Sequence, residues 1–125
     1  MNEDAYLTAQ EHLDKAEHNE AFVLELEPHR NGYPDWAITA LFYSALHYVS
    51  AYLRNCGIRV VTHQERENAI NRGTFRRTIS RPYKRLKARG LLARYGNYKF
   101  SSAEVHDVFK HLDAIKRYAT KKLIH

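Results

Sequence analysis

One pair of side chains has the types and spacing that suit metal-free chemistry on a phosphodiester. His63 and Arg66 stand three positions apart, and residues at this spacing share a face of a helix. A histidine titrates near neutral pH, so it can accept the proton of a ribose 2′-hydroxyl. An arginine presents a planar fork of N–H donors that stabilises a charged phosphate. The pair therefore predicts a catalytic site for RNA cleavage. The alternative is a polar His63 in a first helical turn and an Arg66 that pairs with an acid of the first helix.

Two further groups of residues suit related roles. Arg94 lies near the end of a basic helix, where it could reach the same phosphate, and Tyr95 could stack on a base. The alternative is an arginine that complements the helix dipole and a tyrosine at the edge of the core. His47 and Arg54 lie on a stripe of mostly small residues, which predicts a close helix–helix or subunit interface. There His47 is either a hydrogen-bonded interface residue or a second proton-transfer group.

Charge is distributed unevenly along the chain. The net charge is +6, but residues 1–35 hold nine acidic and two basic residues, whereas residues 72–99 hold ten basic residues and no acid. Such a block predicts a surface that binds RNA or another phosphate-bearing ligand. The alternative is a solvated face that docks the acidic stretch of the same or a neighbouring chain. Four cations at helical spacing are candidate phosphate ligands: Arg81, Lys84, Arg85 and Arg89.

Composition argues against several other classes of protein. Cys56 is the only cysteine, so it forms no disulfide within the chain, and we expect it to be buried at a helix end. No zinc-binding spacing is present, so we expect neither a metal nor another cofactor. The acidic first residues lack the apolar run of a signal peptide. The uncharged residues 36–53 include many polar side chains and predict a buried helix instead of a membrane span. We therefore expect a cytoplasmic protein.

Apolar periodicity predicts a first helix over about residues 4–26 and a second helix that begins at Pro34-Asp35 and ends near Cys56-Gly57. The second helix is apolar nearly all round. We expect it to be covered both by the core and at a subunit interface.

Two capping boxes predict where later helices begin. Thr62 with Glu65 opens a short third helix that ends before Gly73, and Ser101 with Glu104 opens the last helix. A fourth helix is expected over about residues 82–95. Long helices with short connections predict an all-α fold, an antiparallel up-and-down bundle of four to five helices in one domain spanning residues 1–125.

The order of several motifs resembles the HEPN superfamily of helical-bundle ribonucleases and their inactive relatives. The motifs are Trp36-Ala37-x3-Leu41-Phe42-Tyr43-x-Ala45-Leu46-His47, His63-x-x-Arg66, Tyr83-x-x-Leu86 and Ala93-Arg94-Tyr95. The resemblance covers roughly residues 4–120. It implies a bundle that commonly forms a homodimer. It also implies a toxin–antitoxin or phage-defence context, often beside a small nucleotidyltransferase.

The resemblance implies that active members are metal-independent endoribonucleases, with an arginine followed after four to six residues by a histidine. No arginine of this sequence has a histidine at that spacing. The nearest arginines, Arg54 and Arg59, precede His63 by nine and four positions. The catalytic pair of the superfamily is therefore not transferred to this chain.

Three functions follow as hypotheses. The first is a HEPN-like RNA-binding domain that acts, if it is catalytic, as a metal-independent endoribonuclease in a toxin or defence system. The second is a non-catalytic homodimeric module that binds a nucleotidyltransferase-type partner. The third is a bundle that binds a nucleotide or other small phosphate ligand near His63, Arg66 and Arg94.

Overall fold

The computed structural model describes residues 7–26, 32–72 and 76–123. Most of these residues are helical and none forms a β-strand, which confirms the predicted all-α class. The elements are α1 (Ala9–Glu25), α2 (Pro34–Asn55), α3 (His63–Ile70), the π-helical segment η2 (Arg76–Ser80), α4 (Arg81–Tyr95) and α5 (Ser102–Leu123).

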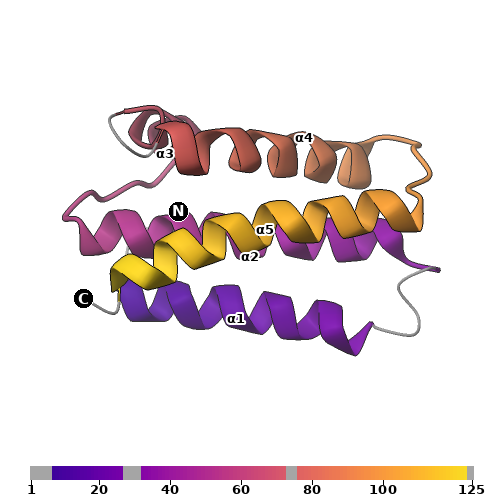
Figure 1. Cartoon of the computed structure of the whole chain (residues 1–125), viewed down its shortest axis with the longest axis horizontal. Coiled ribbons are helices and arrows are strands. Elements are labelled where there is room, and N and C mark those ends of the chain that lie inside the picture. The colour runs from indigo at the N-terminus through magenta and orange to yellow at the C-terminus, as the bar shows by residue number, and fades with distance from the viewer. Residues whose placement is uncertain (1–6, 27–31, 73–75, 124–125) are drawn as a thin grey trace.

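The four long helices lie side by side, and successive ones run in opposite directions (Figure 1). In this view α2 and α5 form the middle of the molecule, with α1 below them and α4 above. The short α3 lies at one end of α4, and η2 leads directly into α4. This arrangement places the basic helix α4 and the acidic helix α1 on opposite sides of the bundle.

Helix α2 is the centre of the core, because it packs against α1, α4 and α5. Every residue from Ala37 to Leu53 is buried except Thr39, Ala40 and Tyr43. Neighbours within one chain therefore cover most of the apolar surface of α2, apart from the exposed rings of Trp36 and Tyr43. None of the described helices, α2 included, is long and apolar enough to cross a membrane.

Local capping signals set the starts of three helices. The Glu65 amide donates to Thr62 Oγ1 over 3.1 Å, and the Thr62 amide donates to Glu65 Oε1 over 3.0 Å, as the predicted capping box requires. The same reciprocal bonds join Ser101 and Glu104 at the start of α5. A third box, formed by Thr8 and Glu11, starts α1 at Ala9, so the expected start near residue 4 is wrong.

Cys56 is exposed, and the prediction that it is buried is also wrong. It is the residue that caps the C-terminal end of α2, where the chain leaves the core before the left-handed turn at Gly57 (φ 81°).

The close packing of α4 on α2 depends on Gly90. A β-carbon at this position would lie 3.1 Å from Phe42 Cβ and 3.3 Å from Arg94 Nη1. We expect Gly90→Val to lower the free energy of unfolding by about 2 kcal/mol, because overpacking a filled core forces side chains to shift. Denaturant unfolding measures the loss. Ala88→Val, on the exposed side of the same helix, is the control. A Gly90 variant as stable as this control would contradict the packing described.

Candidate nucleic-acid interface

His63 is an exposed residue in the first turn of α3, and the capping box at Thr62 fixes its position. Its ring stacks on the buried Phe42 of α2, with ring centroids 6.4 Å apart and planes 28° apart. Its Nδ1 atom lies 3.4 Å from Arg66 Nη1, at the long end for a hydrogen bond. His63 and Arg66 thus lie together, as their spacing predicts.

Arg66 is only 1% exposed and is the largest fully buried side chain of the described residues. Its Nε atom donates to Ser50 Oγ of α2 over 2.9 Å. Among the described residues no carboxylate forms an ion pair with it, so none of the described acids of α1 is the partner that the alternative expects; Asp4 of the expected first helix lies outside the described residues. A buried charge is costly unless an opposite charge compensates it. Arg66 is therefore a preplaced cation whose charge an anionic ligand can balance.

Arg94 reaches the same neighbourhood from the last turn of α4. Its Cζ atom lies 5.3 Å from the ring centroids of both Phe42 and Tyr43 and 5.4 Å from that of Tyr95, within the range of cation–π contacts. Its Nε and Nη1 atoms are buried and have no hydrogen-bond partner in the described part of the chain. Buried donors normally find partners, so these two N–H groups lack hydrogen bonds that the side chain could make with an acceptor only by turning outward.

Tyr83 of α4 adds a fourth polar group. Its hydroxyl is buried, with no hydrogen bond to any described residue. Burial raises the pKa of Tyr83 to about 12, and the nearby Arg66 guanidinium acts in the opposite direction. We call His63, Arg66, Tyr83 and Arg94 the His63 cluster. It combines an exposed imidazole with two arginines that form no ion pair with any described carboxylate.

The surroundings keep His63 neutral at pH 7. Partial burial is the largest cause that lowers its pKa below 6.5, followed by the positive charge of Arg66 and then that of Lys87. Glu67 opposes this shift, but its carboxylate is bound to Lys87 Nζ at 2.6 Å. Because Arg66 can only donate, the neutral imidazole accepts at Nδ1 and carries its proton on Nε2. In this arrangement His63 offers a donor to a ligand, and it can act as a base only after Arg66 releases Nδ1.

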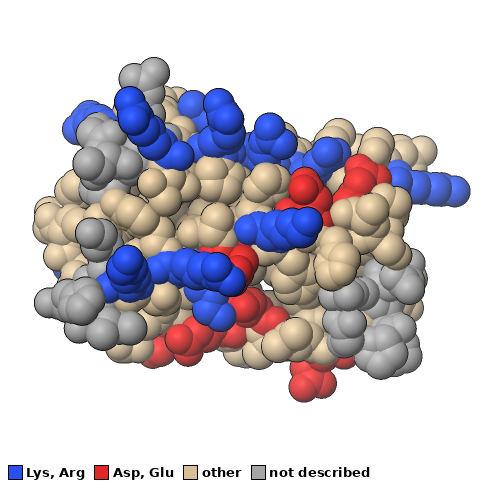
Figure 2. Space-filling view, in the orientation of Figure 1, with Lys and Arg blue, Asp and Glu red and all other residues tan. Residues whose placement is uncertain are grey.

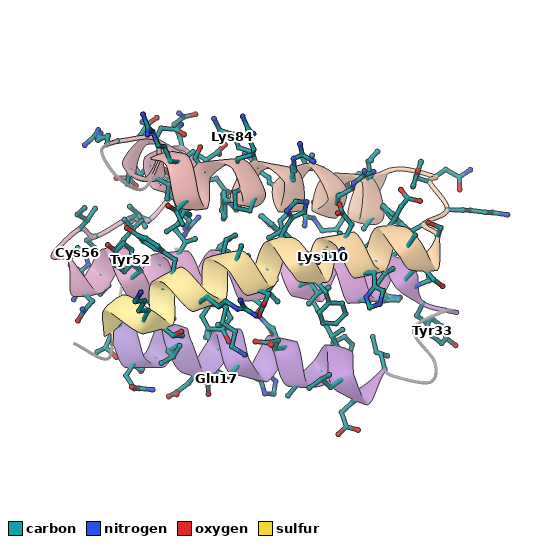
Figure 3. The ribbon with its side chains drawn as sticks, in the orientation of Figure 1. Glu17, Tyr33, Tyr52, Cys56, Lys84 and Lys110 are labelled. Carbon is teal, nitrogen blue, oxygen red and sulfur yellow. The ribbon has the colours of Figure 1, made fainter. Side chains whose placement is uncertain are left out.

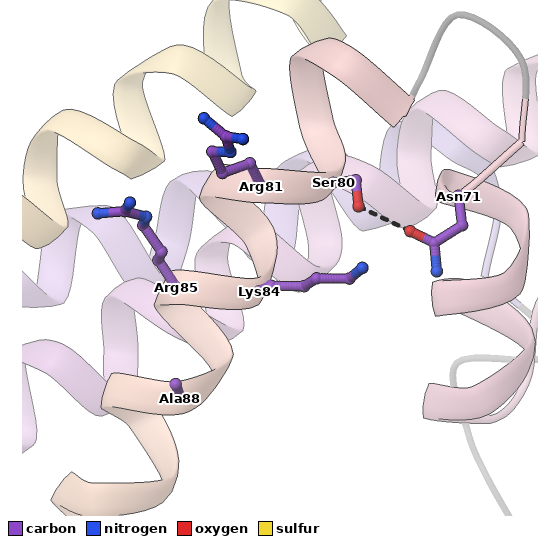
Figure 4. Close-up of a pocket in the computed structure, with 6 residues that line it drawn as sticks. All are labelled: Asn71, Ser80, Arg81, Lys84, Arg85 and Ala88. Carbon is purple, nitrogen blue, oxygen red and sulfur yellow. Dashed lines mark hydrogen bonds between the residues drawn. The ribbon is translucent and has the colours of Figure 1, made fainter.

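A basic pocket lies beyond the other end of α3, against the first turns of α4. It has a volume of about 640 Å³ and is open to solvent. Lys84 extends toward Asn71 between the two helices, and Arg81 and Arg85 project together from another side of α4 (Figure 4). None of these three cations has an ion pair within the described chain. The lining residues are Asn71, Ser80, Arg81, Lys84, Arg85 and Ala88.

Arg89 does not join its predicted partners in the basic pocket. Its Nη1 atom lies 3.3 Å from Glu104 Oε2 of α5, so this arginine ties α4 to α5. The remaining cations of α4 still dominate one side of the molecule. Lys and Arg line the upper edge of Figure 2, over α4, whereas Asp and Glu gather mainly toward the lower edge, over α1.

His47 lies apart from the His63 cluster because it faces α1. Its Nδ1 atom is 3.0 Å from Nδ1 of His12, and both rings are buried. The prediction of a hydrogen-bonded histidine in a helix interface is confirmed within one chain. His12 was missed because nothing in the local sequence pairs two histidines 35 positions apart. Arg54 is half-buried beside a crevice of only about 10 Å³ at the end of α2.

No group of three or more His, Cys, Asp or Glu side chains within residues 7–26, 32–72 and 76–123 could hold a metal ion. Comparison of the chain with protein-family models, with curated proteins and with solved structures gives no match. The case for a function therefore rests on the geometry of the His63 cluster and the basic pocket.

Proposed function

We propose that this chain is a HEPN-like domain that binds RNA through its phosphate groups. The observation that carries the proposal is the buried Arg66 without a carboxylate partner beside the exposed His63. A phosphate at the His63 cluster would supply the missing negative charge. It would also accept from His63 Nε2–H, and from Arg94 once that side chain turned its buried N–H groups outward. Charge-assisted hydrogen bonds of this kind are the strong ones in proteins.

The basic pocket favours an RNA strand over a mononucleotide as the ligand. Lys84 and Arg94 are ten positions apart on α4, which corresponds to about 15 Å along the helix axis. A single phosphate cannot reach both the basic pocket and the His63 cluster, but a polynucleotide backbone presents phosphates along its whole length. Several such contacts give binding that weakens with salt.

The described acids of α1 do not neutralise this surface. Glu20 of α1 accepts from Tyr48 over 2.6 Å and pairs with Lys116 of α5 at 3.1 Å. No described acid of α1 forms an ion pair with a described cation of residues 72–99. The cations of α4 that form no ion pair with described residues, Arg81, Lys84 and Arg85 among them, are thus available to a separate polyanion.

Cleavage of the bound RNA is a second candidate function, favoured by a neutral imidazole beside two arginines. If a phosphate drew Arg66 away from Nδ1, His63 could take the 2′-hydroxyl proton. The 2′-oxygen would then attack phosphorus and the bond to the 5′-oxygen would break. The 5′-oxygen would take a proton from water, and the His63 imidazolium would return its proton to solvent, leaving a 2′,3′-cyclic phosphate. Incubation with RNA in excess EDTA tests this step. Cyclic-phosphate ends that persist in His63→Ala would refute the role of His63.

The rival hypothesis of a non-catalytic homodimeric module rested on two observations, the apolar second helix and the absence of the Arg–His spacing. The absent spacing still favours it. The apolar second helix suggested a subunit interface, yet α1, α4 and α5 cover it within one chain. Such a module would also leave the charge of Arg66 and the basic pocket without a role.

Affinity for RNA should rise as pH falls. The pKa of His63 is lowered in the free protein, and a bound phosphate would raise it because it stabilises the imidazolium. The affinity therefore increases as pH falls through the raised pKa of the complex, and it levels off below the lowered pKa of the free protein. Fluorescence anisotropy with a labelled single-stranded RNA, at fixed salt between pH 8 and pH 5.5, measures the effect. His63→Gln should flatten it. An identical pH dependence in both proteins would refute contact between His63 and phosphate.

A further inference from the structure

Exposed aromatic side chains gather where the start of α2 meets the end of α4. Trp36 is 59% exposed, Tyr43 is 37% exposed and Tyr95 is 81% exposed. Trp36 and Tyr43 are seven positions apart on α2, so they share one face of that helix. Tyr95 follows Arg94 directly. Large aromatic rings left in solvent beside a cation are a feature that core packing does not explain.

A pocket of about 280 Å³ lies between these elements. Asp35, Trp36 and Thr39 of α2 line it on one side, and Ala93 and Arg94 of α4 line it on the other. We call it the aromatic pocket. Arg94 belongs to both this pocket and the His63 cluster, because its guanidinium lies over Phe42, the ring on which His63 stacks. A strand whose phosphate reaches Arg94 would therefore bring its neighbouring base to the aromatic pocket.

We propose that the aromatic pocket binds an unpaired nucleobase, so that the RNA recognised by this chain is single-stranded. The inference rests on the proposed function, because the phosphate contacts bring the base to the pocket. Stacking on Trp36 would provide the main contact, since every base has a π-face. The Asp35 carboxylate can accept a hydrogen bond from a base N–H. Bases inside a duplex are already stacked and cannot enter.

The chain carries its own probe for this contact, because Trp36 is its only tryptophan. Titration with a short oligoadenylate should quench Trp36 fluorescence in parallel with the anisotropy change of a labelled strand. Heparin has negative charges but no bases, so it should compete for binding without quenching. Duplex RNA should bind more weakly and leave the emission unchanged.

Trp36→Ala should lower the affinity for oligoadenylate about 10-fold, as loss of one stacked base does, and should leave the affinity for heparin unchanged. Phe22→Ala is the matched control, since Phe22 is an exposed aromatic residue on α1; it should change neither affinity. RNA binding without quenching, and with equal affinity in Trp36→Ala, would overturn the base pocket but not the proposed function. Absence of any RNA binding would overturn both. A wild-type dimer that Trp36→Ala converts to a monomer would show that the surface binds a second copy instead.

Discussion

Replacing Arg81, Lys84 and Arg85 together with glutamine should weaken binding of single-stranded RNA about 50-fold at 0.15 M salt. Each phosphate contact with a single strand releases about 0.7 of a counterion. Loss of three contacts should therefore reduce the slope of log affinity against log salt by about 2, which corresponds to about 50-fold at this salt concentration. The three side chains are free of ion pairs in the described structure and line the basic pocket. The variant should fold normally because all three are exposed.

The control must remove the same charge from another part of the surface. Lys15→Gln, Lys110→Gln and Lys121→Gln together do so on α1 and α5, where all three lysines are exposed. Figure 3 shows Lys110 on α5 and Lys84 on the outer edge of α4. Anisotropy titrations at several salt concentrations should give a nearly unchanged slope for this control. Equal losses in the two triple variants would mean that net charge alone attracts RNA, and that the basic pocket is not a site.

Replacing Arg66 with methionine, together with Ser50→Ala, should stabilise the protein while weakening RNA binding. Among the described residues the buried guanidinium has neutral partners only. Exchanging even paired buried charges for well-packed apolar side chains is often neutral or stabilising by about 1–4 kcal/mol, and a charge without an ionic partner is costlier to bury. The Ser50 change avoids a hydroxyl without its partner. Affinity for RNA should fall about 30-fold, because a hydrogen bond to a charged group contributes about 2 kcal/mol.

Opposite changes in stability and affinity are the sign of a residue kept for binding. Denaturant unfolding and RNA anisotropy on the same samples measure both. Ser50→Ala alone is the control, and it should leave RNA affinity within a factor of about two. A double variant that is less stable than the wild type and binds RNA equally well would assign Arg66 a structural role.

The parts of the fold that the sequence predicted are those with local causes. Capping boxes place a hydroxyl and a carboxylate three positions apart, so Thr62 with Glu65 and Ser101 with Glu104 could be read directly. The equivalent pair at Thr8 and Glu11 carries the same signal and was overlooked. Helical periodicity likewise located α2 to within one or two residues of its observed ends.

Features of the site that depend on tertiary packing were not predictable in this way. The spacing of His63 and Arg66 placed them on one face, but the burial of Arg66 against Ser50 depends on how α3 docks on α2. Arg89 lies on the same face of α4 as Arg85, yet its side chain reaches Glu104 of α5. The contact of Arg94 with the Phe42 ring depends on how α4 packs on α2, so the apolar periodicity of either helix could not predict it.

The most direct test of the account is an NMR titration of His63 in ¹⁵N-labelled protein, with and without a short single-stranded RNA, in EDTA. We expect the pKa of His63 to lie below 6.5 in the free protein. We also expect a rise of about one unit or more in the complex, because a phosphate near the ring stabilises the imidazolium. The Arg66 Nε–H resonance should shift at the same RNA concentrations. Saturating RNA that leaves the His63 pKa and the Arg66 resonance unchanged would contradict phosphate binding at the His63 cluster.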